Sequence, residues 1–277
     1  MAVVIGSQPL APRPIGARVL GALAGAARVL QRNLLVYRRT WRGSLFGSFL
    51  TPMLYLTAMG IGLGSLVASG GSALLGGVDY LHFLGPGILA SSCMQTASFE
   101  STYPIMGKIA WRRNYEATLA TPIQVHHLLI GELGWIGFRL TTMATVFMVV
   151  LTLFGIPRSP LALLAIPAAV VTGLCFAAPI IGFSATRTND SGFAAIFRFV
   201  VNPLFLFSGT FFPVSQLPDQ VEWIAAATPL YHGVALVRGA VLDSVPADWP
   251  IHVAYLLVFL AATGYVAYRL LRRRLVK

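Results

Sequence analysis

The sequence carries little charge for its length. Of its 277 residues, 10% are Asp, Glu, Lys or Arg and 56% are hydrophobic, whereas charged residues make up about a quarter of a typical soluble domain. Acidic residues are scarcer than basic residues, with 9 Asp and Glu against 20 Lys and Arg. This composition excludes an ordinary soluble globular protein and indicates an integral membrane protein.

Residues and motifs that carry chemistry are also scarce. Cys93 and Cys175 are the only cysteines, and both fall within apolar runs, which argues against a disulfide framework. His126 and His127 are adjacent, but no cysteine or carboxylate stands at ligand spacing beside them. The motifs H-E-x-x-H, G-x-S-x-G and G-x-x-x-x-G-K-[ST] are absent. The sequence therefore predicts no catalytic residue, no metal site and no ATPase site in this chain.

Six apolar runs are long enough to cross about 30 Å of hydrocarbon, which takes about 20 residues of helix. None shows the ten-residue alternation of a membrane barrel, and Pro203 predicts a kink in the fifth run. We expect an all-α integral membrane protein with six transmembrane helices, in one transmembrane domain over residues 44–277. The runs cover about residues 44–67, 80–103, 127–154, 161–185, 192–212 and 250–271.

The first 43 residues divide into two parts. Three prolines between residues 9 and 14 predict a disordered lead over residues 1–17. Over residues 18–43, apolar residues recur at steps of three and four, with arginines roughly opposite. This pattern predicts an amphipathic helix on the inner membrane surface. It could merely anchor the first span or it could contact a partner.

Basic residues indicate the orientation. They gather in the first 43 residues, in the loop after the second run and in the C-terminal tail, whereas residues 213–249 contain only Arg238. The positive-inside rule places both termini in the cytoplasm, and the cytoplasmic membrane is the expected location. The net charge of +11 is explained by this topology and by contact with membrane lipids, so we expect no nucleic-acid partner.

The stretch from residue 207 to 238 is apolar but rich in proline. Pro213, Pro218 and Pro229 break it into pieces too short to cross the bilayer, yet it retains apolar residues such as Trp223. Unpaired backbone is not tolerated against lipid, so the stretch must be buried in protein or lie in the interface. Two short re-entrant helices over residues 214–243, entering from the outer surface, would satisfy it. An ordinary amphipathic connector is the alternative.

The loop between the second and third runs contains a short helical pattern. Tyr115, Glu116 and Leu119 stand among good helix formers, and Pro122 ends the pattern after less than three turns. A short helix that lies across the cytoplasmic end of the spans could transmit a mechanical force to them. The alternative is a basic loop that only determines topology.

Ionisable residues that fall inside the apolar runs include Glu100, Glu132, Arg139 and Arg198. A charge near the bilayer centre costs about 2.5 to 3.5 kcal/mol on insertion scales, so such residues tend to be paired or functional. We predict that Glu100 pairs with Arg139 or a nearby cytoplasmic arginine at the inner mouth. Alternatively, the four residues lie close enough to the interface to be hydrated.

Several segments together carry a resemblance to a known family. They are F-E-S-T-Y (99–103), Y-E-A-T-L-A-T-P (115–122), G-E-L-G-W (131–135), F-S-G-T-F-F-P-V-S-Q-L-P (207–218), P-L-Y-H (229–232) and L-V-R-G (236–239). From about Arg32 onward the chain resembles the ABC-2 family of ATP-binding-cassette permeases. Within it, the nodulation-protein J group of lipo-oligosaccharide exporters is the most similar, followed by daunorubicin-resistance-type permeases.

The resemblance implies a function and its partners. The chain would be the permease subunit of an exporter that moves an amphipathic substrate (a glycolipid, lipo-oligosaccharide or hydrophobic drug) outward across the cytoplasmic membrane. Two cytoplasmic ATPase subunits would bind the ATP and Mg²⁺, and a second permease, identical or paralogous, would complete the complex. A membrane-embedded lipid-modifying enzyme that depends on Glu100 or Glu132, and an autonomous secondary transporter, are the alternatives.

The resemblance also implies roles for particular segments. The family has an interfacial helix before the first span, a coupling helix between spans two and three, and re-entrant helices between spans five and six. Tyr115, Glu116, Leu119 and Pro122 would lie in the coupling helix and insert into a groove of the ATPase. The re-entrant segment would form an outer gate, with Phe211, Phe212 and Pro213 at its hinge and with Pro218, Trp223 and Pro229 further along it.

Overall fold

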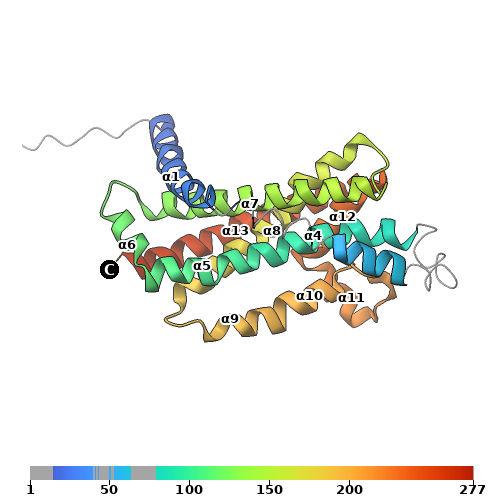
Figure 1. Cartoon of the computed structure of the whole chain (residues 1–277). Helices are drawn as coiled ribbons and strands as arrows, with labels where there is room; N and C mark the ends of the chain where they lie inside the picture. Colours follow the sequence, from blue (N-terminus) through green and yellow to red (C-terminus); the bar gives the residue numbers. More distant parts are fainter. Residues whose placement is uncertain are drawn as a thin grey trace, which may run out of the picture.

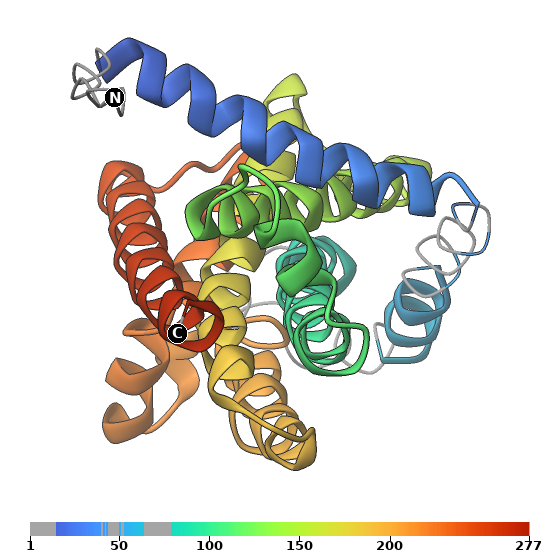
Figure 2. The same cartoon turned by 90° about the vertical axis from the view of Figure 1, so that its left-hand side faces the viewer.

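The computed structural model of the chain describes residues 15–39, 41, 43, 50, 53–63 and 79–276. Over these residues the chain is helical, with short turns and without a β-strand. Most of the long helices run side by side, whereas α1 (Ile15–Tyr37) crosses them (Figure 1). Figure 2, turned by 90°, shows α1 along its length and the other long helices nearly end on. The fold is therefore a helical bundle with one helix lying across it.

Three helical segments are long and apolar enough to cross a membrane. They are α7 (Val125–Leu153), the segment Pro160–Thr186, and α13 (Trp249–Leu275). The second of these begins with the 3₁₀ turn η4 (Pro160–Leu164) and continues as α8 (Ala165–Thr186). The apolar runs at 127–154, 161–185 and 250–271 thus correspond to helices of spanning length.

The other apolar runs correspond less closely to single helices. α4 (Tyr80–Ser101) has 22 residues and matches the run at 80–103. Residues 53–57 are α-helical and continue into the π-helical turn η1 (Ala58–Leu63). The rest of the expected first span, residues 44–49, 51–52 and 64–67, lies outside the described residues, and so do residues 1–14 of the expected disordered lead.

The fifth apolar run is shorter and more broken than expected. It contains α9 (Ser191–Ile196), the π-helical turn η5 (Phe197–Val201) and α10 (Asn202–Phe207), so it ends five residues before the predicted residue 212. Gly209 with φ 83° ends it, because glycine adopts the left-handed conformation at a helix terminus without steric cost. The irregular turn ends two residues before Pro203, whose missing N–H disturbs the hydrogen bonds of the turn before it.

The crossing helix also differs from its expected bounds of 18–43. The described part of α1 begins at Ile15. It ends at Tyr37, and Arg38 and Arg39 follow in a turn. Cations are favourable at this end of the helix dipole.

Short helices occupy the two ends of the bundle. α5 (Tyr103–Met106), the π-helical turn η3 (Gly107–Trp111) and α6 (Asn114–Leu119) follow α4 at one end. The 3₁₀ turn η6 (Val214–Gln216), α11 (Asp219–Ala226) and α12 (Pro229–Leu242) precede α13 at the other. Figure 1 shows α6 and α11 at opposite ends of the molecule. The two segments that the sequence singles out are thus separated by the length of the bundle.

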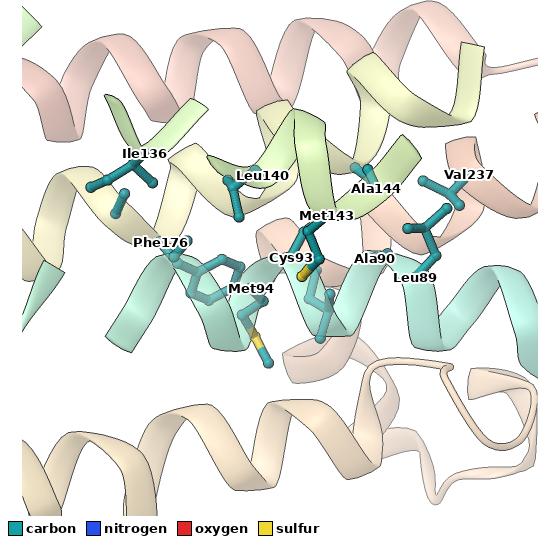
Figure 3. Close-up of a cluster of buried hydrophobic side chains, with 14 of the residues drawn as sticks. Leu89, Ala90, Cys93, Met94, Ile136, Leu140, Met143, Ala144, Phe176 and Val237 are labelled. Atoms are coloured by element: carbon teal, nitrogen blue, oxygen red, sulfur yellow. The ribbon is translucent and has the colours of Figure 1, made fainter. Parts of the chain in front are cut away.

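The core is centred on α8, which packs against α4, α7, α12 and α13. Figure 3 shows side chains from α4, α7 and α8 meeting there, among them Cys93, Leu140 and Phe176. At Gly173 of α8, an added Cβ would lie 3.0 Å from the Cys93 carbonyl oxygen and 2.6 Å from Leu140 Cδ1. Small residues permit this close approach, which supplies dispersion contacts where lipid offers no hydrophobic driving force. The core thus holds the two end segments on a closely packed frame.

Candidate functional site

The α6 end of the bundle contains a buried carboxylate, Glu132 of α7, whose side chain is 1% exposed. Lys108 Nζ of η3 donates to Glu132 Oε2 over 2.6 Å, and Asn33 Nδ2 of α1 donates to the same oxygen over 3.1 Å. Arg32 Nη2 of α1 lies 3.7 Å from Oε1. Residues Arg32, Asn33, Lys108 and Glu132 are called the Glu132 cluster below. One carboxylate thus joins three helical elements.

Close packing at Gly131 positions this cluster. An added Cβ at Gly131 would lie 2.6 Å from Val29 Cβ and 2.9 Å from the Ala26 carbonyl oxygen of α1. Only glycine permits α1 to approach α7 so closely at that point. One turn further along α1, Arg32 and Asn33 then come opposite Glu132, because residues three and four apart share a helix face.

The cluster extends to α6 through Arg32, whose Nη1 donates to Thr118 Oγ1 over 3.2 Å. Tyr115 of α6 is buried at 1% exposure. Its burial, followed by the negative charge of Glu132, raises the pKa of the Tyr115 hydroxyl well above its usual value, so the phenol stays neutral. Arg113 precedes α6 with φ 48°, which turns the chain sharply into this short helix. α6 is therefore bonded to α1 through Arg32, which in turn faces Glu132 of α7.

The predicted coupling residues lie in different surroundings. Tyr115, Glu116 and Leu119 belong to α6, and they are buried, exposed and partly buried respectively. Pro122 is exposed and lies three residues beyond the end of α6, in agreement with the expectation that this proline stops the helix. Its effect on the preceding residue ends the helical conformation before the proline is reached. Glu116 and Pro122 are the accessible members of the set.

The other predicted intramembrane charges also have defined positions. Arg139 Nη2 lies 3.2 Å from Glu100 Oε1, and both side chains are largely buried, which confirms the predicted pairing. The Arg139 guanidinium also lies 5.2 Å from the centre of the Tyr37 ring of α1. Arg198 of η5 is exposed on the described part of the chain and does not join the other three charges.

The opposite end of the bundle is organised by Arg238 of α12. Its Nη2 donates to the Gly209 carbonyl over 2.7 Å and its Nε donates to the Phe83 carbonyl over 3.2 Å. The guanidinium lies 3.7 Å from the centre of the Phe83 ring, a cation–π distance. These three residues are called the Arg238 cluster. It joins α12, the turn after α10 and the first turn of α4.

The turn after α10 is buried against α4. Thr210 is fully buried, and its Oγ1 lies 2.6 Å from Ser91 Oγ of α4. An added Cβ at Gly87 would lie 2.8 Å from the Thr210 carbonyl oxygen, so glycine is needed for this contact. The segment is therefore packed into the bundle with its polar groups paired, as membrane burial requires.

The predicted outer-gate residues are distributed around this turn. Phe211 and Phe212 make edge-to-face ring contacts with Phe205 and Phe207 of α10, at 5.0 and 6.5 Å between ring centres. The remaining four residues differ in exposure: Pro213 is partly buried, Pro229 is buried, and Pro218 and Trp223 are exposed. The structure thus brings the two phenylalanines together with α10 and leaves Trp223 on the surface of this chain.

Sequence reasoning did not identify Arg32, Asn33, Lys108 or Arg238 as site residues. Lys108 was visible as one of two lysines in the chain, and Arg238 as the only basic residue in 213–249. A histidine pair was also missed: His232 Nδ1 lies 2.6 Å from His252 Nδ1, between α12 and α13. Among the described residues, no group of three His, Cys, Asp or Glu side chains is placed to hold a metal.

Neutralising Glu132 should destabilise the protein more than removing the ion pair as a whole. Glu132→Gln leaves Lys108 buried without its carboxylate, which costs about 3 to 5 kcal/mol, whereas apolar replacement of both partners is often neutral. We expect Glu132→Gln to lower the thermal midpoint in detergent, and the double variant Lys108→Met/Glu132→Met to recover much of the loss. Glu116→Gln, on the exposed side of α6, is the control and should leave the midpoint unchanged. Equal midpoints for Glu132→Gln and this control would contradict the assignment.

Replacing Arg238 should loosen the turn after α10. Arg238→Met keeps much of the apolar stem but leaves the buried Gly209 carbonyl without its donor, at about 1 to 3 kcal/mol for a buried acceptor. We expect faster proteolysis near residue 209 and a lower thermal midpoint. Arg158→Met is a matched control, because Arg158 is exposed while its backbone N–H bonds to Val241 of the same α12. If Arg238→Met and Arg158→Met were cleaved near residue 209 at the same rate, Arg238 would not anchor this turn.

Comparison with known proteins identifies a family to which this chain is similar in sequence. The family described as ABC-2 type transporter matches residues 27–242. Nodulation protein J of Rhizobium leguminosarum bv. viciae is 31% identical over 249 residues, which are 90% of this chain and 94% of that protein. Nodulation protein J of Rhizobium meliloti (strain 1021) is 29% identical over 248 residues, 90% of this chain and 93% of that protein. The chain is an integral membrane protein and belongs to the ABC-2 type transporter family.

Proposed function

We propose that this chain is the permease subunit of an ATP-driven exporter whose ATPase is a separate cytoplasmic protein. The observation that carries the proposal is the attachment of α6 to the bundle. Arg32 bonds to Thr118 of α6, and the same arginine faces the buried Glu132 carboxylate. A force applied to α6 would therefore reach α1 and α7 together, as a coupling helix requires.

The surface around α6 is suited to a protein partner. Glu116 and Pro122 are exposed there. On the α13 side, a hollow of about 560 Å³ is lined by residues that include Leu119, His126 and Arg272. We propose that two ATPase subunits, which bind ATP and Mg²⁺, contact this surface in a complex with a second permease, identical or paralogous.

The proposed topology has six spans and places both termini in the cytoplasm. The arginines at the end of α13, Arg272, Arg273 and Arg274, lie at the same end of the bundle as α6, and this agrees with the positive-inside rule. α11 and α12 then form the re-entrant segment on the outer side. The complex would lie in the cytoplasmic membrane.

The proposed cargo is amphipathic: a glycolipid, a lipo-oligosaccharide or a hydrophobic drug. The relatives named nodulation protein J support this class through the resemblance of the whole chain. The structure adds that the turn between α10 and α12 is held by the Arg238 cluster against α4. We propose that release of this turn opens the outer end of the path, with Phe211 and Phe212 moving relative to α10.

The alternative of a lipid-modifying enzyme finds no support in the two carboxylates on which it would depend. Glu100 is paired with Arg139, and Glu132 is paired with Lys108. A general base needs access to substrate, whereas the Glu132 side chain is almost completely buried. Both residues are better explained as structural charges that join helices.

Reversing the charge of Glu116 tests the proposed coupling surface. Because Glu116 is exposed and absent from the Glu132 cluster, Glu116→Arg should leave the thermal midpoint of the permease unchanged. It should reduce the ATPase recovered with the permease after mild detergent extraction by about tenfold, the effect of losing about 1.4 kcal/mol of binding. Glu222→Arg, in α11 at the opposite end, should not affect recovery. Full recovery with Glu116→Arg, or no ATPase recovered with the native chain, would overturn the proposal.

A further inference from the structure

A second hollow lies on the other side of α6, between it and α1. Its volume is about 430 Å³, within the range of small-ligand pockets. Arg28, Val29 and Arg32 of α1 form one wall, and the other includes Asn114, Thr118 and Thr121. The hollow is thus lined by cations on one side and by hydrogen-bonding side chains on the other.

The charge in this hollow is not neutralised by the residues around it. Arg28 is exposed, and its guanidinium makes no ion pair or hydrogen bond with any residue that the structure describes. Glu132 is the acid that Arg32 faces, at 3.7 Å, but Lys108 Nζ already binds that carboxylate at 2.6 Å. Glu116 does not line the hollow. An anionic ligand would therefore find the Arg28 guanidinium available, beside an Arg32 whose counter-ion Glu132 is shared with Lys108.

The residue types favour a phosphate group. Guanidinium groups present planar sets of N–H donors that match phosphate oxygens. Arg28 and Arg32 are four residues apart and so share one face of α1. Asn114 adds an amide whose side chain has no hydrogen-bond partner among the described residues. Three side chains can therefore donate toward one group of anionic oxygens.

The setting of α1 indicates where that phosphate comes from. α1 lies across the bundle (Figures 1 and 2), and its Leu35 and Val36 side chains are 60% and 65% exposed. A helix that crosses the spans and exposes large apolar side chains is placed to lie in the membrane interface. The hollow would then be at the depth of the lipid headgroups, and the cytoplasmic leaflet is the one that carries anionic lipids.

We propose that the hollow between α1 and α6 binds the phosphate of an anionic phospholipid of the cytoplasmic leaflet. Arg28 and Asn114 hold the phosphate, and Arg32 links it to Thr118 of α6. Bound lipid stabilises the attachment of α1 to α6. The proposal rests on the cytoplasmic placement of α6 given above, but it concerns the permease chain alone and needs no ATPase.

The test measures phospholipid binding to the purified full-length chain. Native mass spectrometry after detergent exchange would compare phosphatidylglycerol with phosphatidylcholine, and a thermal-shift titration would give the dissociation constant. We expect phosphatidylglycerol to bind more tightly and to raise the thermal midpoint. Arg28→Gln should weaken its binding by about tenfold, as expected for loss of one charge-assisted contact, without changing the midpoint of the lipid-free protein.

Arg38→Gln is the matched control. Arg38 is exposed in the turn after α1 and does not line the hollow, so this variant makes the same charge change outside the proposed site. An equal loss of binding in both variants, or no loss in Arg28→Gln, would overturn the proposal in favour of diffuse attraction to the basic surface.

Two further measurements distinguish a lipid phosphate from free phosphate and from an acidic segment of the partner. If inorganic phosphate raised the thermal midpoint as much as phosphatidylglycerol does at equal concentration, the lipid assignment would be overturned. If Arg28→Gln lost the ATPase but kept the lipid, the hollow would bind an acidic segment of the partner, which also contradicts the proposal. Loss of lipid with the ATPase retained would support the lipid site, whereas failure of the exporter proposal would appear as absence of the ATPase from the native complex.

Discussion

The arrangement of the α6 end depends on one buried carboxylate. Glu132 is 1% exposed, in a helix long and apolar enough to span a membrane, and a charge there is tolerated only when it is paired. Its partners come from η3 and α1, so the need to neutralise one side chain determines how three elements meet. Removing either helix from this contact would leave the carboxylate partly or wholly uncompensated. α1, η3 and α7 are therefore joined at one point by this carboxylate.

At the opposite end of the bundle, the charge that joins several segments is a cation, Arg238. Arg238 is held by two backbone carbonyls and one aromatic ring, and no carboxylate bonds to it among the described residues. The Gly209 carbonyl, just beyond the end of α10, would otherwise need another partner. α4 links the two ends, because Phe83 near its start contacts Arg238 and Glu100 near its end pairs with Arg139 of α7.

The features predictable from the sequence were those determined locally. Long apolar runs gave the helices of spanning length, and the prolines at 218 and 229 marked the starts of α11 and α12. The Glu100–Arg139 pair was also predictable, because two charges in apolar runs need a partner. The α6 pattern gave a short helix, although its end fell before Pro122.

The features that could not be predicted depend on contacts between distant residues. Lys108 is 24 residues from Glu132, and Asn33 is 99 residues from it, so no local pattern indicates that they meet. Arg238 and Phe83 are 155 residues apart. The early end of α10 depends on Gly209, whose left-handed conformation is one of several that glycine adopts freely. Such outcomes are decided by tertiary packing rather than by propensity.

A site-specific photo-crosslink at position 116 tests whether a cytoplasmic ATPase acts on this chain through α6. A photoreactive amino acid in place of Glu116 would be activated in intact cells, with position 222 of α11 as the control at the other end of the bundle. The account predicts a covalent adduct between position 116 and a nucleotide-binding ATPase, and none from position 222. Adducts to the ATPase from both positions, or from neither while the permease is correctly inserted, would contradict it.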